Sequence, residues 1–149
     1  MITTVLGSCV SATFYHPVSS AAAIFHAMLP ICCGYLNEKR SCKYVDVAVD
    51  EIMVRFGKLG IKAHDLDVKL FGGGFTIDPE RKDAVRDIVD VGRKNVSAAR
   101  DSLAKHGLKV MAEDVLGRRG RKVFFLTATG EVWVRPVSAE AGDLDSSLF

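Results

Sequence analysis

Residues 2–30 read ITTVLGSCVSATFYHPVSSAAAIFHAMLP, and this stretch predicts the framework of the fold. Residues 2–6 are short and partly β-branched, which favours a strand. Residues 10–15 favour a second strand, and the longer apolar run 21–29 favours a third. The segment from Pro17 to Ser20 is typical of a turn. The stretch therefore predicts one strand followed by a β-hairpin.

The rest of the chain is predicted to add two helices and further strands. A helix fits residues 44–59, whose apolar side chains recur at intervals of three and four. A second helix is expected from Gly92 to near Gly107, whereas the charged residues 76–90 cannot be assigned. Further strands are expected at residues 66–71, 108–112, 122–127 and 131–136, the last two joined by a hairpin turn at 128–130. Helices packed on mostly antiparallel strands predict a mixed-sheet α+β domain built in layers.

Size and composition set limits on the class of protein. The 149 residues are 48% hydrophobic, enough for one domain to bury a core without disulfides or metals. We expect residues 1–137 to form this domain. Residues 138–149, which are acidic and rich in small side chains, are expected to form a flexible C-terminal tail.

Charge and hydropathy exclude several functions. The net charge of +2, from 20 basic and 18 acidic residues, argues against a general nucleic-acid binder. No apolar run approaches the roughly 20 residues that span a bilayer, which argues against membrane insertion. The N-terminus has no secretory signal pattern, so a cytoplasmic location is expected. In that reducing compartment the four cysteines are expected to be thiols.

Cys9 is the candidate nucleophile. It follows Gly7 and Ser8 at a strand junction, where an open turn can direct backbone N–H groups at a developing oxyanion. If the third strand pairs with the second, His26 could face Cys9 across the hairpin. A paired imidazole would lower the thiol pKa toward an ion pair, which would make Cys9 and His26 one nucleophilic unit.

Each of these residues also has a structural interpretation. Cys9 could be a buried thiol, and His26 could be a satisfied core histidine. The hydroxyl of Thr3 or Thr4 could orient the imidazole, or both threonines could simply fill a strand. The residues alone leave these alternatives open.

Three other motifs have weaker functional interpretations. Residues 71–75 (FGGGF) lack the ending of a phosphate loop, so they favour a glycine turn that brings backbone close to the site. Residues 117–122 (GRRGRK) form a basic loop, which is either a solvated turn or a contact for an acidic partner. Zinc binding by Cys32, Cys33, Cys42 and a histidine is an alternative, although their spacing is not that of a zinc ribbon.

Short segments along the chain form a specific pattern. They are residues 3–10 (TTVLGSCV), 26–30 (HAMLP), 43–46 (KYVD), 69–73 (KLFGG), 92–96 (GRKNV), 112–115 (AEDV) and 132–135 (VWVR). In this order, and over nearly the whole chain, they resemble the CheD family of chemoreceptor glutamine deamidases. The resemblance implies a three-layer α/β sandwich related to cysteine deamidase toxins such as cytotoxic necrotizing factor.

The resemblance also implies roles for individual residues. The catalytic cysteine of the family falls on Cys9, its histidine on His26 and its threonine on Thr3. In the family a further stretch of chain usually precedes this threonine, whereas only two residues do here. We expect the backbone at Gly7 and Ser8 to line the site and to supply the oxyanion donors.

The implied reaction is hydrolysis of glutamine side chains to glutamate through a cysteine thioester, with no metal or organic cofactor. Glutamate methyl esters would pass through the same thioester. The implied partners are the cytoplasmic helices of methyl-accepting chemoreceptors, and in some species a CheC-type chemotaxis phosphatase. We expect Arg118, Arg119 and Arg121 to contact the acidic receptor. The alternative function is a regulatory partner of the phosphatase with little catalysis.

Overall fold

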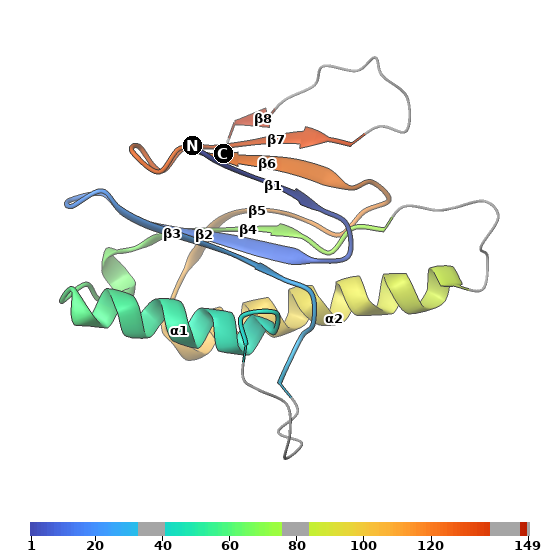
Figure 1. Ribbon diagram of the computed structural model, residues 1–149, viewed down its shortest axis with the longest axis horizontal. Helices are drawn as coiled ribbons and strands as arrows, with labels where there is room; N and C mark the ends of the chain where they lie inside the picture. Colours follow the sequence, from blue (N-terminus) through green and yellow to red (C-terminus); the bar gives the residue numbers. More distant parts are fainter. Residues whose placement is uncertain (33–40, 76–83, 138–146, 149) are drawn as a thin grey trace.

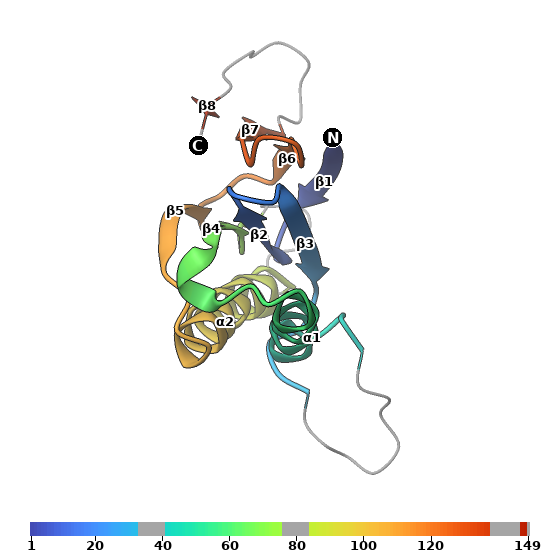
Figure 2. The same cartoon turned by 90° about the vertical axis from the view of Figure 1, so that its left-hand side faces the viewer.

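The computed structural model describes residues 1–32, 41–75, 84–137 and 147–148, and these residues form three layers (Figure 1). Two four-stranded sheets are stacked face to face. The turned view shows both long helices against the outer face of one sheet (Figure 2). The predicted α+β three-layer sandwich with two main helices is therefore confirmed. Its strands form two sheets rather than one mixed sheet.

The first sheet has the order β1-β6-β7-β8, and every neighbouring pair is antiparallel. Its strands are β1 (Ile2–Leu6), β6 (Arg121–Phe125), β7 (Val132–Pro136) and β8 (Ser147–Leu148). The first three match predicted strands closely. β8 falls within the predicted tail, and the rest of that tail lies outside the described residues.

The second sheet has the order β3-β2-β4-β5. Its strands are β2 (Val10–His16), β3 (Ala21–Ala27), β4 (Asp67–Gly72) and β5 (Val110–Val115). The predicted β2–β3 hairpin is confirmed. Strands β4 and β5 are parallel, as a helical crossover between them allows.

Two helices cover the second sheet. Helix α1 spans Val45–Lys58, close to its prediction, and a single 3-10 turn, η1 (Ala63–Asp65), follows it. Helix α2 spans Ala84–Lys105, so it begins well before the predicted start at Gly92. The prediction was wrong here because the charges of residues 84–91 hid an apolar pattern that continues that of the later turns. Among the described residues, no helix is long and apolar enough to cross a membrane.

Strand β2 is the centre of the molecule because both of its faces are buried. Val10, Ala12 and Phe14 belong to the core between the second sheet and the helices. On the opposite face, Tyr15 joins the core between the two sheets, and Cys9 packs against that same core. Because side chains alternate along a strand, the face that carries Cys9 looks toward the first sheet.

Candidate active site

The first contact of the candidate site joins the two sheets. Strands β1 and β3 are edge strands of different sheets. The Thr4 hydroxyl on β1 lies 2.8 Å from Nδ1 of His26 on β3. Figure 2 shows these two edges on the same side of the molecule. The contact places the imidazole at the edge where the two sheets meet.

Thr4, rather than Thr3, is the threonine that contacts His26. Leu6 is fully buried between the sheets, and Thr4 shares its face of β1 because side chains alternate. Thr3 shares the opposite face with Val5, and both are exposed. The structure gives the contact with the imidazole to Thr4, and the catalytic role expected for Thr3 stays a prediction. The burial of Leu6, which places Thr4 on the inner face of β1, is a property of the fold that the sequence alone does not show.

Cys9 and His26 are diagonal neighbours on the hairpin. The residue directly opposite His26 is Ser11, and Cys9 precedes Ser11 by two positions. Diagonal positions of this kind lie roughly 7–8 Å apart, which long side chains can bridge. The expectation that the two residues face each other is corrected to this offset. The described contacts include no hydrogen bond between the thiol and the ring.

Burial favours the neutral form of both groups. Desolvation raises the pKa of the Cys9 thiol, although its own backbone N–H acts in the opposite direction. Desolvation also lowers the pKa of His26, even though part of this residue reaches solvent. Both shifts act against the predicted ion pair, which stays a prediction. A neutral imidazole beside a thiol is instead a general base beside its proton donor.

The Thr4 contact suits an imidazole that changes charge. A neutral imidazole has one N–H and one acceptor nitrogen, whereas the imidazolium donates from both nitrogens. A hydroxyl can accept from Nδ1–H in either state. When it does, Nε2 is left free to take up a proton and later to release it.

The glycine turn of residues 71–75 contacts the backbone of Cys9, as predicted. The Gly73 N–H donates to the Cys9 carbonyl at 2.8 Å. Gly72 has φ +111°, and a Cβ there would lie 2.2 Å from the same carbonyl oxygen. Only glycine allows this approach. In contrast, a Cβ on Gly7 would meet nothing within 4 Å, so Gly7 leaves open space beside the turn.

Asn95 on α2 also touches this turn. Its side chain is fully buried, and Nδ2 lies 3.0 Å from the carbonyl oxygens of both Ser8 and Met28. Sequence reasoning included Asn95 in a family-like segment but gave it no role. An asparagine one helical turn from Gly92 and beside Val96, on the apolar face of α2, was the pattern that could have revealed it.

The basic loop divides into buried and exposed parts. Arg121 is 6% exposed, and it donates to the carbonyls of Gly72, Asp114 and Leu116. It also pairs with the Asp114 carboxylate at 3.0 Å, while burial lowers its pKa. Arg121 therefore secures the loop, and the expectation that it contacts a partner is corrected.

Arg118 and Arg119 remain exposed, and the loop that carries them lies close to the glycine turn. Leu116 N–H donates to the Gly72 carbonyl at 2.7 Å. Phe75 N–H donates to the Gly117 carbonyl at 3.0 Å. These two bonds join the loop that carries both arginines to the glycine turn, whose Gly73 N–H in turn donates to Cys9.

Among the described residues, the cysteines proposed as alternative zinc ligands do not form a cluster. No cluster of three or more His, Cys, Asp or Glu side chains there has the arrangement of a metal site. The backbone N–H of Cys32 donates to Asp46, and Cys42 is exposed. Cys33 lies outside the described residues.

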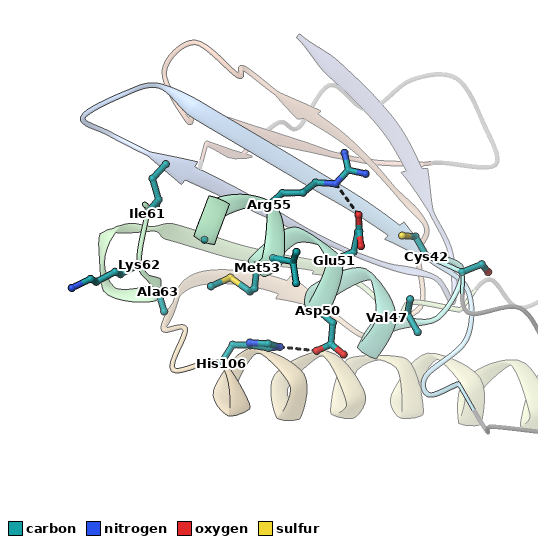
Figure 3. Close-up of a pocket in the computed structure, with 13 residues that line it drawn as sticks. Cys42, Val47, Asp50, Glu51, Met53, Arg55, Ile61, Lys62, Ala63 and His106 are labelled. Carbon is teal, nitrogen blue, oxygen red and sulfur yellow. Dashed lines mark hydrogen bonds and ion pairs between the residues drawn. The ribbon is translucent and has the colours of Figure 1, made fainter. Parts of the chain in front are cut away.

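A groove of about 980 Å³ runs along α1 (Figure 3). Four of the side chains that line it form two pairs. Asp50 lies 2.7 Å from His106, and Glu51 lies 3.0 Å from Arg55. Neither Cys9 nor His26 lines this groove, so the groove is separate from the candidate site.

Comparisons with known proteins agree with the resemblance. Residues 28–136 match the family model described as CheD chemotactic sensory transduction. The chain is 51% identical over 149 residues to a probable chemoreceptor glutamine deamidase CheD of Nitratidesulfovibrio vulgaris, covering 99% of this chain and 75% of the relative. It is 43% identical over 145 residues to a protein of the same description from Oleidesulfovibrio alaskensis, covering 97% and 68%. It is 42% identical over 143 residues to probable chemoreceptor glutamine deamidase CheD 2 of Geobacter sulfurreducens, covering 96% and 84%.

Proposed function

This chain belongs to the CheD family, and we propose that it is a chemoreceptor glutamine deamidase. It hydrolyses glutaminyl side chains of receptor proteins to glutamyl side chains and releases ammonia. The reaction converts a neutral amide into a carboxylate, so it changes the charge of the receptor. Cys9 is the nucleophile, His26 is the general base and acid, and Thr4 orients His26.

The chemistry follows from the protonation states at the site. Neutral His26 accepts the thiol proton while the Cys9 sulfur attacks the carboxamide carbon of glutamine. The protonated imidazole then gives that proton to the amide nitrogen, ammonia leaves and a thioester remains. Water, deprotonated by His26, attacks the thioester carbon. Collapse releases glutamate, and the proton returns to the Cys9 sulfur.

The Thr4–His26 contact of 2.8 Å is the observation that carries this assignment. It spans two separate sheets, and it fixes the ring at the edge where the two sheets meet. His26 is exposed, so it is not a histidine enclosed in the core. The contact has the role of the orienting third group in a nucleophile–base arrangement.

Mass spectrometry of a purified receptor cytoplasmic fragment tests the proposal. Incubation with the wild-type protein should convert specific glutamines to glutamates and release an equal amount of ammonia. Cys9→Ser should lose this activity. Cys42→Ser, which removes an exposed thiol elsewhere, should keep it. Full activity in Cys9→Ser would reject the proposed nucleophile, and no conversion by the wild type would reject the function.

Arg118 and Arg119 form the exposed basic rim of the proposed site. Receptor methylation regions rich in glutamate would be attracted to such a rim, because complementary charge raises encounter rates. Arg118→Glu combined with Arg119→Glu should slow receptor deamidation and flatten its dependence on salt. Hydrolysis of a small uncharged ester should be unchanged. Equal losses on both substrates would indicate a damaged fold.

The resemblance also supports a second role as a partner of a CheC-type phosphatase. Such docking would not require the thiol, so it should survive Cys9→Ser in a pull-down with that phosphatase. A cytoplasmic location fits the substrate proposed here, because the modified receptor helices are cytoplasmic.

A further inference from the structure

The side-chain amide of Asn95 bridges two backbone segments of the site. Its Nδ2 donates at 3.0 Å to the carbonyl of Ser8 and at 3.0 Å to the carbonyl of Met28. Both neighbours are acceptors, so the orientation of the amide is determined by its surroundings. Ser8 directly precedes Cys9, and Met28 follows His26 by two residues. One side chain therefore holds the nucleophile turn and the histidine strand together.

The peptide bond between Ser8 and Cys9 is planar, so the Asn95–Ser8 hydrogen bond also orients the Cys9 N–H. In a trans peptide the carbonyl oxygen and the next N–H point in opposite directions. Asn95 draws the Ser8 carbonyl toward α2, so the Cys9 N–H is directed away from the helix. This N–H and the sulfur belong to the same residue, so covalent geometry keeps them close together. That is where the oxyanion of a tetrahedral intermediate would form.

We propose that Asn95 is a positioning residue that aims the Cys9 N–H at the oxyanion and fixes the spacing between Cys9 and His26. The proposal rests on the assignment of Cys9 and His26 as the catalytic pair. Asn95 itself is fully buried behind the turn and touches no substrate.

An unpaired atom of the same side chain supports this role. Asn95 Oδ1 is buried, and it has no hydrogen-bond partner among the described residues. A buried polar atom without a partner lowers stability. Asn95 therefore lowers stability in a way that an apolar residue of the core would not. What it provides is the amide group, whose two N–H bonds can both donate.

Close backbone packing determines which turn of α2 faces the site. A Cβ on Gly92 would lie 2.6 Å from the Gly73 carbonyl oxygen, so only glycine lets the helix approach the glycine turn. Asn95 lies one helical turn further along and meets Ser8. The Gly73 N–H meets the Cys9 carbonyl on the other side of the same residue. The nucleophile is therefore held through the carbonyls on both sides of its Cα.

The test compares Asn95→Leu, which keeps the branched shape of the side chain but has no donor, with Leu103→Ala as a matched control. Leu103 is fully buried on the same helix, two turns further along. Folded fraction is measured by near-UV circular dichroism and urea unfolding. Deamidation of a receptor fragment gives kcat and KM, and iodoacetamide gives the pH profile of Cys9 alkylation.

For Asn95→Leu we expect kcat per folded molecule to fall about 10- to 100-fold, the range for a misplaced reacting group, with little change in KM. The Cys9 alkylation profile should move to higher pH, because the N–H no longer stabilises the thiolate. Leu103→Ala should lose stability but keep both properties. Asn95→Ser, a smaller change assayed at low temperature where it is folded, should show the same direction of effect.

Wild-type kcat per folded molecule and an unchanged alkylation profile in both Asn95 variants would overturn the inference. That result would leave the proposed function intact, provided that the wild type deamidates and Cys9→Ser does not. Loss of the underlying function would appear differently, as inactivity of the wild type or activity of Cys9→Ser.

Discussion

Replacing Thr4 with valine separates the orienting role of this residue from its structural role. Valine keeps the β-branched shape that suits a strand and removes only the hydroxyl. Thr3→Val is the matched control, because Thr3 lies next to Thr4 on the opposite, exposed face of β1. The two variants have the same chemistry and differ only in the face that they alter.

The magnitude follows from the lost hydrogen bond to His26 Nδ1 at 2.8 Å. A neutral hydrogen bond contributes about 0.5–1.5 kcal/mol, and one to a charged group about 1.5–3 kcal/mol. With a factor of ten for each 1.36 kcal/mol, the neutral range corresponds to about 2- to 13-fold in rate. Because His26 becomes charged during the reaction, the loss in kcat should lie at or above the upper end of this range.

Steady-state deamidation of a receptor fragment, with ammonia release as the signal, measures this loss. Thr4→Val should have a reduced kcat, a similar KM and stability within about 1 kcal/mol of the wild type. Thr3→Val should match the wild type in all three. A larger loss in Thr3→Val than in Thr4→Val would refute the assignment and would return the orienting role to Thr3.

Three further predictions concern the thiol, the turn and the loop. Alkylation of Cys9 should rise with pH through the alkaline range, because burial raises its pKa; a rate plateau below neutral pH would instead reveal a thiolate–imidazolium pair. Gly72→Ala should destabilise the fold by about 3 kcal/mol or more in urea unfolding, because it combines backbone strain at φ +111° with a clash against the Cys9 carbonyl. Gly7→Ala, the control, should be tolerated. Equal effects of the two substitutions would show that the turn adapts. Arg121→Met should cost at least about 2 kcal/mol of stability because it strands buried carbonyls, and a neutral result would make this arginine dispensable to the loop.

Local patterns predicted most elements but not their stacking. Alternation and turn residues predicted the hairpin of β2 and β3, and the spacing of apolar residues predicted α1. Nothing local shows that the strands divide into two sheets, because pairing such as β1 with β6 joins distant parts of the chain. The predicted start of α2 was wrong because charged residues before Gly92 obscure the helical spacing of the apolar residues among them.

In the candidate site, too, the sequence predicted some residues, whereas the fold determined the others. Cys9 and His26 were predicted from a strand junction, a hairpin and the family resemblance. The choice between Thr3 and Thr4 depends on which face of β1 is buried, which is a tertiary property. Arg121 looked like an exposed cation because a run of basic residues is usually solvated, yet it is buried among carbonyls. Only the fold brings Asn95 to Ser8.

Trapping the covalent intermediate tests the central claim most directly. A thioester between Cys9 and a receptor glutamine should react with hydroxylamine in competition with water. Mass spectrometry of the receptor fragment should then find a hydroxamate at the same glutamines that the wild-type protein converts to glutamate, and none with Cys9→Ala. Glutamate formation at an unchanged rate without any hydroxamate, or hydroxamate formation by Cys9→Ala, would contradict a thioester on Cys9.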